Sequence, residues 1–376
     1  MSIERHYFPG NNTPLGFYSY YKYILGQREA HKIICIKGGP GTGKSTFMKK
    51  IGEAMAERGE DIDYLHCSAD ENSLDGIVLK KGKIAFIDGT SPHTTDPVTP
   101  GAVDRILNLG EYWNEAGIAA NKQEIIDLNE ACSGWYRVAY NYLNAAKSVF
   151  RSLEEIYNRA AEYNEIYRVV ADISAREYGN YDISIQPGKV SNFFASAITS
   201  SGVVDYLTSL LEDMEKIYII NVPTGYSNNS FMTILREGAI YRGLDTEAYY
   251  CSLGPDEKID HLLIPQLKLA FVTVNEYHDI EPWEICDEDG RVQEITLLDI
   301  SDYMDCVEIA QNGELLECLQ DELDALLDRA VECLKKAKEL HLQVESMYVP
   351  NMNFTGINRL LEETIRELTQ EANSHK

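Results

Sequence analysis

The hydrophobic pattern of the chain first shows an apolar run of strand length followed by helical spacing. Residues 33–36 are apolar and mostly β-branched, and a glycine-rich stretch, residues 38–43, follows almost at once. Beyond it, Phe47, Met48, Ile51 and Met55 recur at helical intervals, and Gly59 fits a helix C-cap. The pattern predicts a strand, a loop and a helix in direct succession.

Longer helical patterns follow in both halves of the chain. Residues 111–178 contain no proline and are rich in Ala, Glu, Asn and Tyr. One helix of that length would extend about 100 Å, so we expect a hairpin or small bundle that breaks near Cys132–Trp135. Residues 313–349 and 356–372 predict two more amphipathic helices, as in an appended or lid-like helical subdomain.

The sequence repeats itself at an offset of 184 residues. Between positions 32–68 and 216–252, 12 of 37 residues are identical, against about 2 or 3 expected from average residue usage. The matches include Ile33/Ile217, Gly41/Gly225, Phe47/Phe231, Met48/Met232 and Cys67/Cys251. The register continues with small slips, at 185 for His93/His278 and at 191 for Tyr112/Tyr303. The chain is therefore predicted to be a tandem duplication of one unit.

Composition and charge narrow the class of protein. The length of 376 residues predicts two domains, and a composition of 44% hydrophobic and 25% charged residues is typical of a globular protein. No apolar run is long enough to span a bilayer and no secretion signal is visible, so we expect a cytoplasmic protein without a membrane partner. Eight scattered cysteines without a C-x-x-C pair argue against a zinc ribbon, and a net charge of −26 makes nucleic acid an improbable partner.

The glycine-rich stretch carries the chemistry of a phosphate-binding loop. It fits the pattern G-x-x-x-x-G-K-[ST] between a strand and a helix. Glycines allow successive N–H groups to line a concave nest, the lysine adds a charge for the β- and γ-phosphates, and the serine hydroxyl suits Mg²⁺. The predicted nucleotide-binding residues are Gly38, Gly39, Pro40, Gly41, Thr42, Gly43, Lys44, Ser45 and Thr46.

A second apolar run supplies the expected partner of that loop. Residues 84–87 predict a buried strand that ends at Asp88, a Walker B candidate on the metal side together with Ser45. The next residue is Gly89 rather than a water-activating glutamate, so a group that positions water must come from elsewhere. His93, Asp96 and Glu111 are the candidates, although turn chemistry explains the first two equally well.

The repeat of the loop has lost these groups. Residues 222–229 keep Gly225, but Lys44 and Ser45 are replaced by Asn228 and Asn229, and Asp88 by Thr273. Each lost charge-assisted contact is worth about 1.5–3 kcal/mol. We therefore expect Mg-nucleotide binding in the first half only.

Two further groups of residues leave alternatives open. Arg137, Arg151, Arg159, Arg168 and Arg176 punctuate the first helical segment. They would suit lid arginines of a kinase, or simply a solvated face that interleaves with glutamates. Tyr18, Tyr20 and Tyr21 would either stack on a base or pack helices.

These observations predict an α/β protein of two tandem P-loop NTPase domains, residues 1–185 and 186–376, the second degenerate. Each domain is expected to hold a mostly parallel sheet with helices on both faces and an appended helical subdomain.

Four segments resemble one family in particular: "RHYFPGNNTPLGFYSYY", "KGGPGTGKSTFMKKIG", "LHCSADENSLDGI" and "IAFIDGTSPHTTDPVTPGAVDRILNLGEYWNE". They are similar to bacterial tandem P-loop proteins described as ATPases or nucleotide kinases, and the resemblance covers essentially the full chain. It implies an ATP-binding P-loop fold in two copies. In that family the second loop is often intact, and Asn228 and Asn229 depart from it here.

Three functions agree with this reading of the sequence. The first is a Mg²⁺-dependent ATPase that couples hydrolysis to movement between the halves. The second is phosphoryl transfer to a small acceptor or nucleotide, and the third is a non-catalytic nucleotide sensor with a protein partner. All three place ATP and Mg²⁺ at the first loop.

Overall fold

The computed structural model describes residues 2–90, 95–280, 285 and 291–374, and within these ranges each half forms a six-stranded, mostly parallel sheet. The first has the order β1-β5-β6-β7-β4-β8, with β1 (Glu4–Tyr7), β4 (Lys32–Lys37), β5 (Ile62–His66), β6 (Leu74–Leu79), β7 (Ile84–Asp88) and β8 (Asp104–Asn108). The second has the order β9-β13-β14-β15-β12-β16, with β9 (Val190–Phe193), β12 (Lys216–Asn221), β13 (Thr246–Cys251), β14 (Gly254–Ile264), β15 (Leu269–Val274) and β16 (Glu294–Asp299).

The two sheets repeat each other strand for strand. In both, the third strand in this order runs antiparallel to its neighbours, β6 in the first half and β14 in the second. The register also repeats, because Ile36 lies beside Asp88 in one sheet and Ile220 beside Thr273 in the other. The duplication predicted from the sequence is confirmed at the level of topology, and Thr273 occupies the position of Asp88.

The remaining elements repeat in the same way. They form five matched pairs, β2 (Gly10–Thr13) with β10 (Ser196–Thr199), β3 (Gly16–Ser19) with β11 (Gly202–Asp205), α1 (Lys44–Ala56) with α6 (Asn229–Ile240), η2 (Leu109–Tyr112) with η4 (Ile300–Tyr303), and α2 (Glu115–Ala119) with α8 (Cys306–Gln311). η1 (Tyr21–Tyr23) and α5 (Leu207–Leu210) follow the two hairpins, and η3 (Pro265–Leu267) joins β14 to β15.

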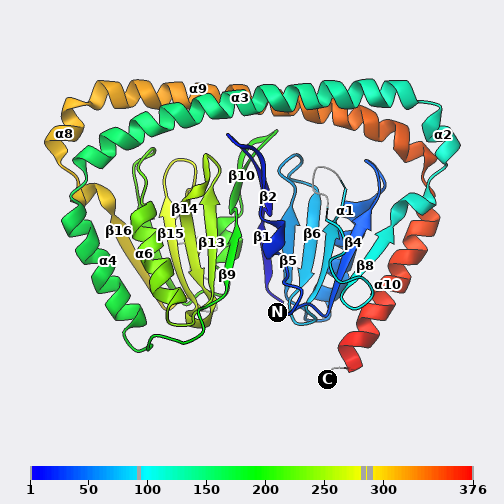
Figure 1. Ribbon diagram of the computed structural model, residues 1–376, viewed down its shortest axis with the longest axis horizontal. Helices are drawn as coiled ribbons and strands as arrows, with labels where there is room; N and C mark the ends of the chain where they lie inside the picture. Colours follow the sequence, from blue (N-terminus) through cyan, green and yellow to red (C-terminus); the bar gives the residue numbers. More distant parts are fainter. Residues whose placement is uncertain (1, 91–94, 281–284, 286–290, 375–376) are drawn as a thin grey trace.

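Two long helices lie side by side above both sheets (Figure 1). α3 (Lys122–Ala160) runs from the first half to the second, and α9 (Gly313–Tyr348) returns. Their buried residues recur at alternating intervals of 3 and 4, as in coiled coils: Ala139, Leu143, Ala146, Phe150 and Leu153 on α3, and Leu323, Leu327, Ala330, Leu334 and Ala337 on α9.

The predicted break near Cys132–Trp135 is therefore wrong. α3 is one helix of 39 residues and passes through this segment. It does not need to fold back on itself, because α9 covers its apolar face along its length. A single glycine, Gly134, costs only about 1 kcal/mol within a helix that gains this much packing.

The helices that follow α3 and α9 are exchanged between the halves. α4 (Tyr163–Tyr178) packs on the second sheet, where Ile166, Val170 and Ile173 join its core. α10 (Phe354–Ser374), preceded by η5 (Val349–Asn351), packs beside α1 on the first sheet. The boundary expected near residue 185 separates the two sheets, but these two helices each cross to the other half (Figure 1).

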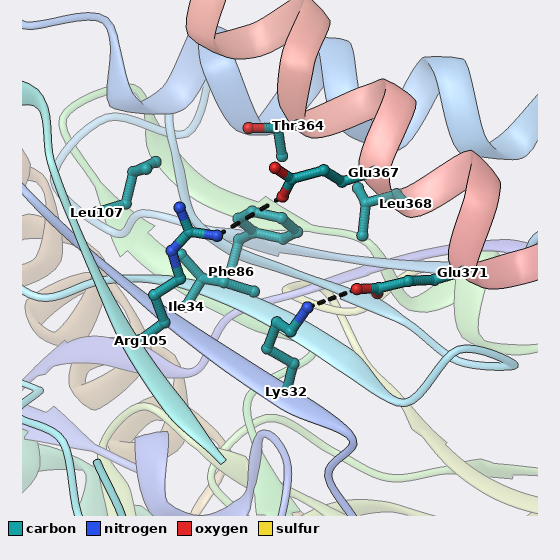
Figure 2. A pocket seen from close by; sticks show the side chains of 9 residues that line it. All are labelled: Lys32, Ile34, Phe86, Arg105, Leu107, Thr364, Glu367, Leu368 and Glu371. Atoms are coloured by element: carbon teal, nitrogen blue, oxygen red, sulfur yellow. Dashed lines mark hydrogen bonds and ion pairs between the residues drawn. The ribbon is translucent and has the colours of Figure 1, made fainter. Parts of the chain in front are cut away.

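Apolar contacts and ion pairs hold α10 on the first sheet. Ile357, Leu361 and Leu368 share a core with side chains of β4, β7 and α1. Figure 2 shows two ion pairs at the rim, Lys32 Nζ to Glu371 Oε1 at 2.7 Å and Arg105 to Glu367 at 3.6 Å.

The points where the chain crosses between the halves have matching hydrogen bonds. Asn114 N donates to Asn351 O at 2.7 Å, and Asp305 N donates to Ala160 O at 2.8 Å. The two donors, Asn114 and Asp305, lie 191 residues apart in the sequence, and so do the two acceptors, Ala160 and Asn351. The exchange is thus a pseudo-twofold feature of the whole chain.

The opposite faces of the two sheets share one core. Its cluster includes Cys35, Leu65 and Ala85 from the first sheet and residues such as Ile219, Leu263 and Val272 from the second, with Leu207 and Leu210 of α5 between them. The prediction of helices on both faces of each sheet is therefore wrong for this face, where the described ranges place only short helical turns such as α5, because the two halves cover each other there.

One buried cation joins the halves across this core. Arg5 Nε lies 2.8 Å from Asp63 Oδ1, and Arg5 Nη1 lies 2.9 Å from Glu247 Oε2. Asp63 and Glu247 are repeat partners at an offset of 184, so Arg5 sits between equivalent carboxylates of the two halves. Throughout the described ranges, no helix combines the length and apolar character needed to cross a membrane.

Candidate functional site

The glycine-rich loop, residues 38–43, connects β4 to α1 as predicted. Gly41 and Gly43 have φ angles of 67° and 86°, in the left-handed region that glycine adopts without strain. Gly43 is the N-cap of α1, so the N-terminal dipole of the helix faces the loop. Thr42 is buried and its Oγ1 donates to Gly39 O at 2.9 Å, which closes the turn.

Lys44 lies across this loop. Its Nζ donates to Gly38 O at 2.9 Å and to Gly39 O at 3.0 Å, and lies 3.6 Å from Asp88 Oδ2. Both side chains are only 13% exposed, so an ammonium and a carboxylate meet in a restricted space at the carboxyl ends of β4 and β7. The structure thus brings together the two charged residues that the sequence predicted for this site.

Ser45 and Thr46 stand in the first turn of α1. Ser45 Oγ accepts a hydrogen bond from Leu74 N at 3.0 Å, which fixes the hydroxyl at the start of the helix. Thr46 is exposed, and Pro40 is half-buried in the loop. Of the two hydroxyls in this turn, Ser45 is therefore the one with a fixed hydrogen-bond partner.

Thr90 is a site residue that the sequence reasoning missed. Its backbone N donates to Asp88 Oδ1 at 2.8 Å, and its hydroxyl donates to Gly38 O at 2.8 Å. It therefore orients the carboxylate and ties β7 to the loop. A hydroxyl two residues after a strand-ending Asp is the local signal that would have suggested it.

The three candidates for positioning water have different outcomes. His93 lies outside the described residues. The Asp96 carboxylate is 79% exposed and pairs with Lys37 Nζ at 2.8 Å, while the same ammonium donates to Gly89 O and Thr95 O. This contact joins the end of β4 to Gly89, Thr95 and Asp96. Glu111 is exposed in the first turn of η2.

Residues from the far end of the chain cover the loop. Gly41 N donates to Glu345 Oε1 of α9 at 3.1 Å. A Cβ at Gly39 would lie 2.8 Å from the Tyr348 ring, and one at Gly41 would lie 3.0 Å from Val349 Cγ2. We call Glu345, Tyr348 and Val349 the cover. The sequence reasoning missed all three, because they lie about 300 residues from the loop they contact.

The second loop, residues 222–228, contributes side chains to the core of its own half. Val222 and Tyr226 are buried in the core of the second half. Asn228 Nδ2 donates to Thr273 Oγ1 at 2.7 Å, where the first half has the Lys44–Asp88 pair. A neutral hydrogen bond therefore replaces the two charges, and the loop keeps the strand–turn–helix form.

No protein family, curated protein sequence or solved structure compared with the chain matches it. The resemblance to tandem P-loop proteins therefore remains a prediction, and the site has to be judged from its own geometry.

The open alternatives from the sequence concern residues away from this loop. Three of the five helix arginines pair with glutamates on exposed faces: Arg151 with Glu257, Arg159 with Glu308 and Arg168 with Glu165. Arg176 pairs with the buried Glu177, and Arg137 is exposed on α3. Tyr20 is buried, its hydroxyl donates to Pro255 O, and its ring lies 5.2 Å from that of Tyr18, so these tyrosines pack where the hairpins meet.

A separate cluster of charges is buried in the second half. His278, the repeat partner of His93, has Nδ1 at 2.8 Å from Asp205 Oδ2 and Nε2 at 3.5 Å from Asp260 Oδ2. Despite burial, the hydrogen bonds and charges of these two carboxylates raise the pKa of His278 to about 9. Lys258 Nζ lies 2.9 Å from Asp260 Oδ1, so the cluster is internally paired.

The residues present fit a magnesium ion bound with phosphate. No group of three or more His, Cys, Asp or Glu side chains in the described part of the chain is placed to hold a metal ion. Mg²⁺ beside phosphates needs fewer protein ligands, because phosphate and water supply most of its oxygens. The Ser45 hydroxyl, in the first turn of α1, and the Asp88 carboxylate, at the end of β7, are suitable protein oxygens.

Proposed function

We propose that the first half binds a Mg²⁺–nucleoside triphosphate, ATP, at the glycine-rich loop and hydrolyses it, while the second half is a non-binding copy. The observation that carries the proposal is the Lys44–Asp88 pair, 3.6 Å apart, against a loop whose amides and helix N-terminus favour anions. The second half keeps the fold and has neither charge.

Lys44 would exchange its present partners for phosphate. Its Nζ now donates to two loop carbonyls, and a triphosphate in the nest would offer charged oxygens instead. Ser45 and Asp88 would hold Mg²⁺, which when bound neutralises charge on the phosphates. Thr90 would keep the Asp88 carboxylate oriented throughout.

The contact between the loop and the cover supports an ATPase in which hydrolysis moves one half relative to the other. The loop touches α9, and α9 pairs with α3 along the length that joins both halves. When the ligand bound at the loop changes, the element directly in contact with it is therefore α9, which connects the two halves. This contact favours a coupled ATPase over a kinase that acts in one half alone.

Phosphate release from the purified protein with Mg-ATP tests the proposal. We expect release in the wild type, a loss of at least about tenfold in Lys44→Ala, and no change in Asn228→Ala, the matched position of the second half. Release that persists in Lys44→Ala would contradict the proposal. Lys44-dependent ATP binding without release would leave a sensor, and release of ADP only with an added acceptor would indicate a kinase.

A further inference from the structure

The cover places a carboxylate where a phosphate would bind. Glu345 Oε1 accepts from Gly41 N at 3.1 Å, so this loop amide already has an anionic partner. A carboxylate oxygen and a phosphate oxygen are both anionic acceptors for such a nest. The same N–H cannot serve both without sharing a weakened bond.

The carboxylate is also well placed electrostatically. The N-terminus of α1 favours an anion at this loop, and the Lys44 ammonium lies beside it, paired with Asp88, while the chain as a whole carries −26. Glu345 is half-buried at this point, so its charge is less screened than that of a surface glutamate. Its interaction with the loop is therefore specific rather than one of many solvated contacts.

We propose that Glu345 is an internal anion that competes with the nucleotide's phosphates for the glycine-rich loop, so that ATP binds only when the cover is displaced. This inference rests on the proposed function and adds its regulation. The apparent association constant for ATP equals the intrinsic constant multiplied by the fraction of molecules in which the loop is uncovered.

Displacement of the cover requires movement of helices that contact both halves. Tyr348 and Val349 lie directly against Gly39 and Gly41, so the carboxylate cannot leave far without the end of α9 moving as well. That end continues into α10, which is held on the first sheet by Leu361, Leu368 and the Lys32–Glu371 ion pair (Figure 2). Occupation of the loop is thereby linked to the docking of α10 and to the α3–α9 pair.

The second half provides an internal control. The repeat partner of Glu345 is Glu154 on α3, since 345 − 191 is 154. There the loop glycine Gly225 is met by the apolar Leu153, at 2.5 Å from a built Cβ, and the loop has no lysine. A carboxylate at this position has no phosphate site to compete for.

Titration calorimetry with Mg-ATP on the full chain tests the proposal. Glu345→Gln keeps the size of the side chain and removes its charge, and we expect ATP to bind about fivefold more tightly. Glu345→Ala, which removes the acceptor as well, should bind at least as tightly as Glu345→Gln. Glu154→Gln and Glu339→Gln, the latter an exposed residue of the same helix, each remove one negative charge and should leave the affinity within twofold.

The outcomes separate this inference from the proposed function. If the wild type binds Mg-ATP in a Lys44-dependent manner and Glu345→Gln binds equally or less tightly, the inference is overturned and the proposed function stands. If the wild type shows no Lys44-dependent binding, both are overturned. Hydrogen exchange of residues 345–353 gives a second readout, because Mg-ATP should speed it in the wild type, and unchanged or slower exchange contradicts displacement of the cover.

Discussion

The exchange of helices predicts that a mutation near the C-terminus weakens the core of the first half. Leu361 lies on α10, is 7% exposed, and shares a core with Ile34, Met48 and Phe86. Leu361→Ala removes most of this side chain from a cluster built by strands more than 250 residues earlier in the chain. The loss of stability should therefore appear in the first sheet.

The size of the effect follows from the burial of the side chain. Replacing a buried leucine by alanine costs about 2–5 kcal/mol, the higher values applying where the surroundings cannot collapse into the cavity. At about 1.4 kcal/mol for each factor of ten, this corresponds to a roughly 30-fold to several-thousand-fold increase in the equilibrium constant for opening of the core around Leu361.

Hydrogen exchange measured by mass spectrometry locates that effect. We expect Leu361→Ala to accelerate exchange in β4, β7 and β8. The matched control is Val170→Ala on α4, the repeat partner at an offset of 191, which is 1% exposed and should accelerate exchange in β12 and β15 instead. Acceleration by Leu361→Ala confined to the second sheet would refute the exchange.

Three further predictions concern the joint between the halves, pH and the second loop. Arg5→Ala leaves the carboxylates of Asp63 and Glu247 buried without their shared cation and should lower the free energy of unfolding by about 3–5 kcal/mol. A urea titration that shows a decrease of less than about 1 kcal/mol would contradict this. Burial lowers the pKa of His66 to about 4 from an ordinary 6.5, so its contribution to stability is lost as pH falls through this range. We expect a loss of about 2–3 kcal/mol between pH 7 and 4.5, largely absent in His66→Gln, and equal losses in both proteins would show the assignment to be wrong. Asn228→Ala should leave Mg-ATP affinity within twofold in calorimetry, and a large loss would show that the second loop binds nucleotide.

Much of the site was predictable because its signals are local. The glycine pattern, Lys44 and Ser45 are adjacent in sequence, and Asp88 is found at the end of an apolar run. The repeat then fixed Thr273 as the counterpart of Asp88, which the strand register confirms. These inferences need only the chain near each residue or a comparison of the chain with itself.

The partner of each helix was not predictable in this way. The apolar faces of α4 and α10 show that each helix must pack on something, but helical periodicity does not say which of two similar sheets it covers. The same ambiguity hid the cover, because nothing near Glu345 in the sequence points to Gly41. The 3-and-4 spacing along residues 139–153 did contain the information that α3 pairs with another long helix rather than folding back.

Calorimetric titration of the purified chain with Mg-ATP tests the central claim most directly. The account predicts saturable binding at one site per chain, with affinity reduced at least about tenfold in Lys44→Ala. Absence of binding to the wild type, binding at two sites, or an affinity unchanged in Lys44→Ala would contradict the assignment of the glycine-rich loop as the nucleotide site.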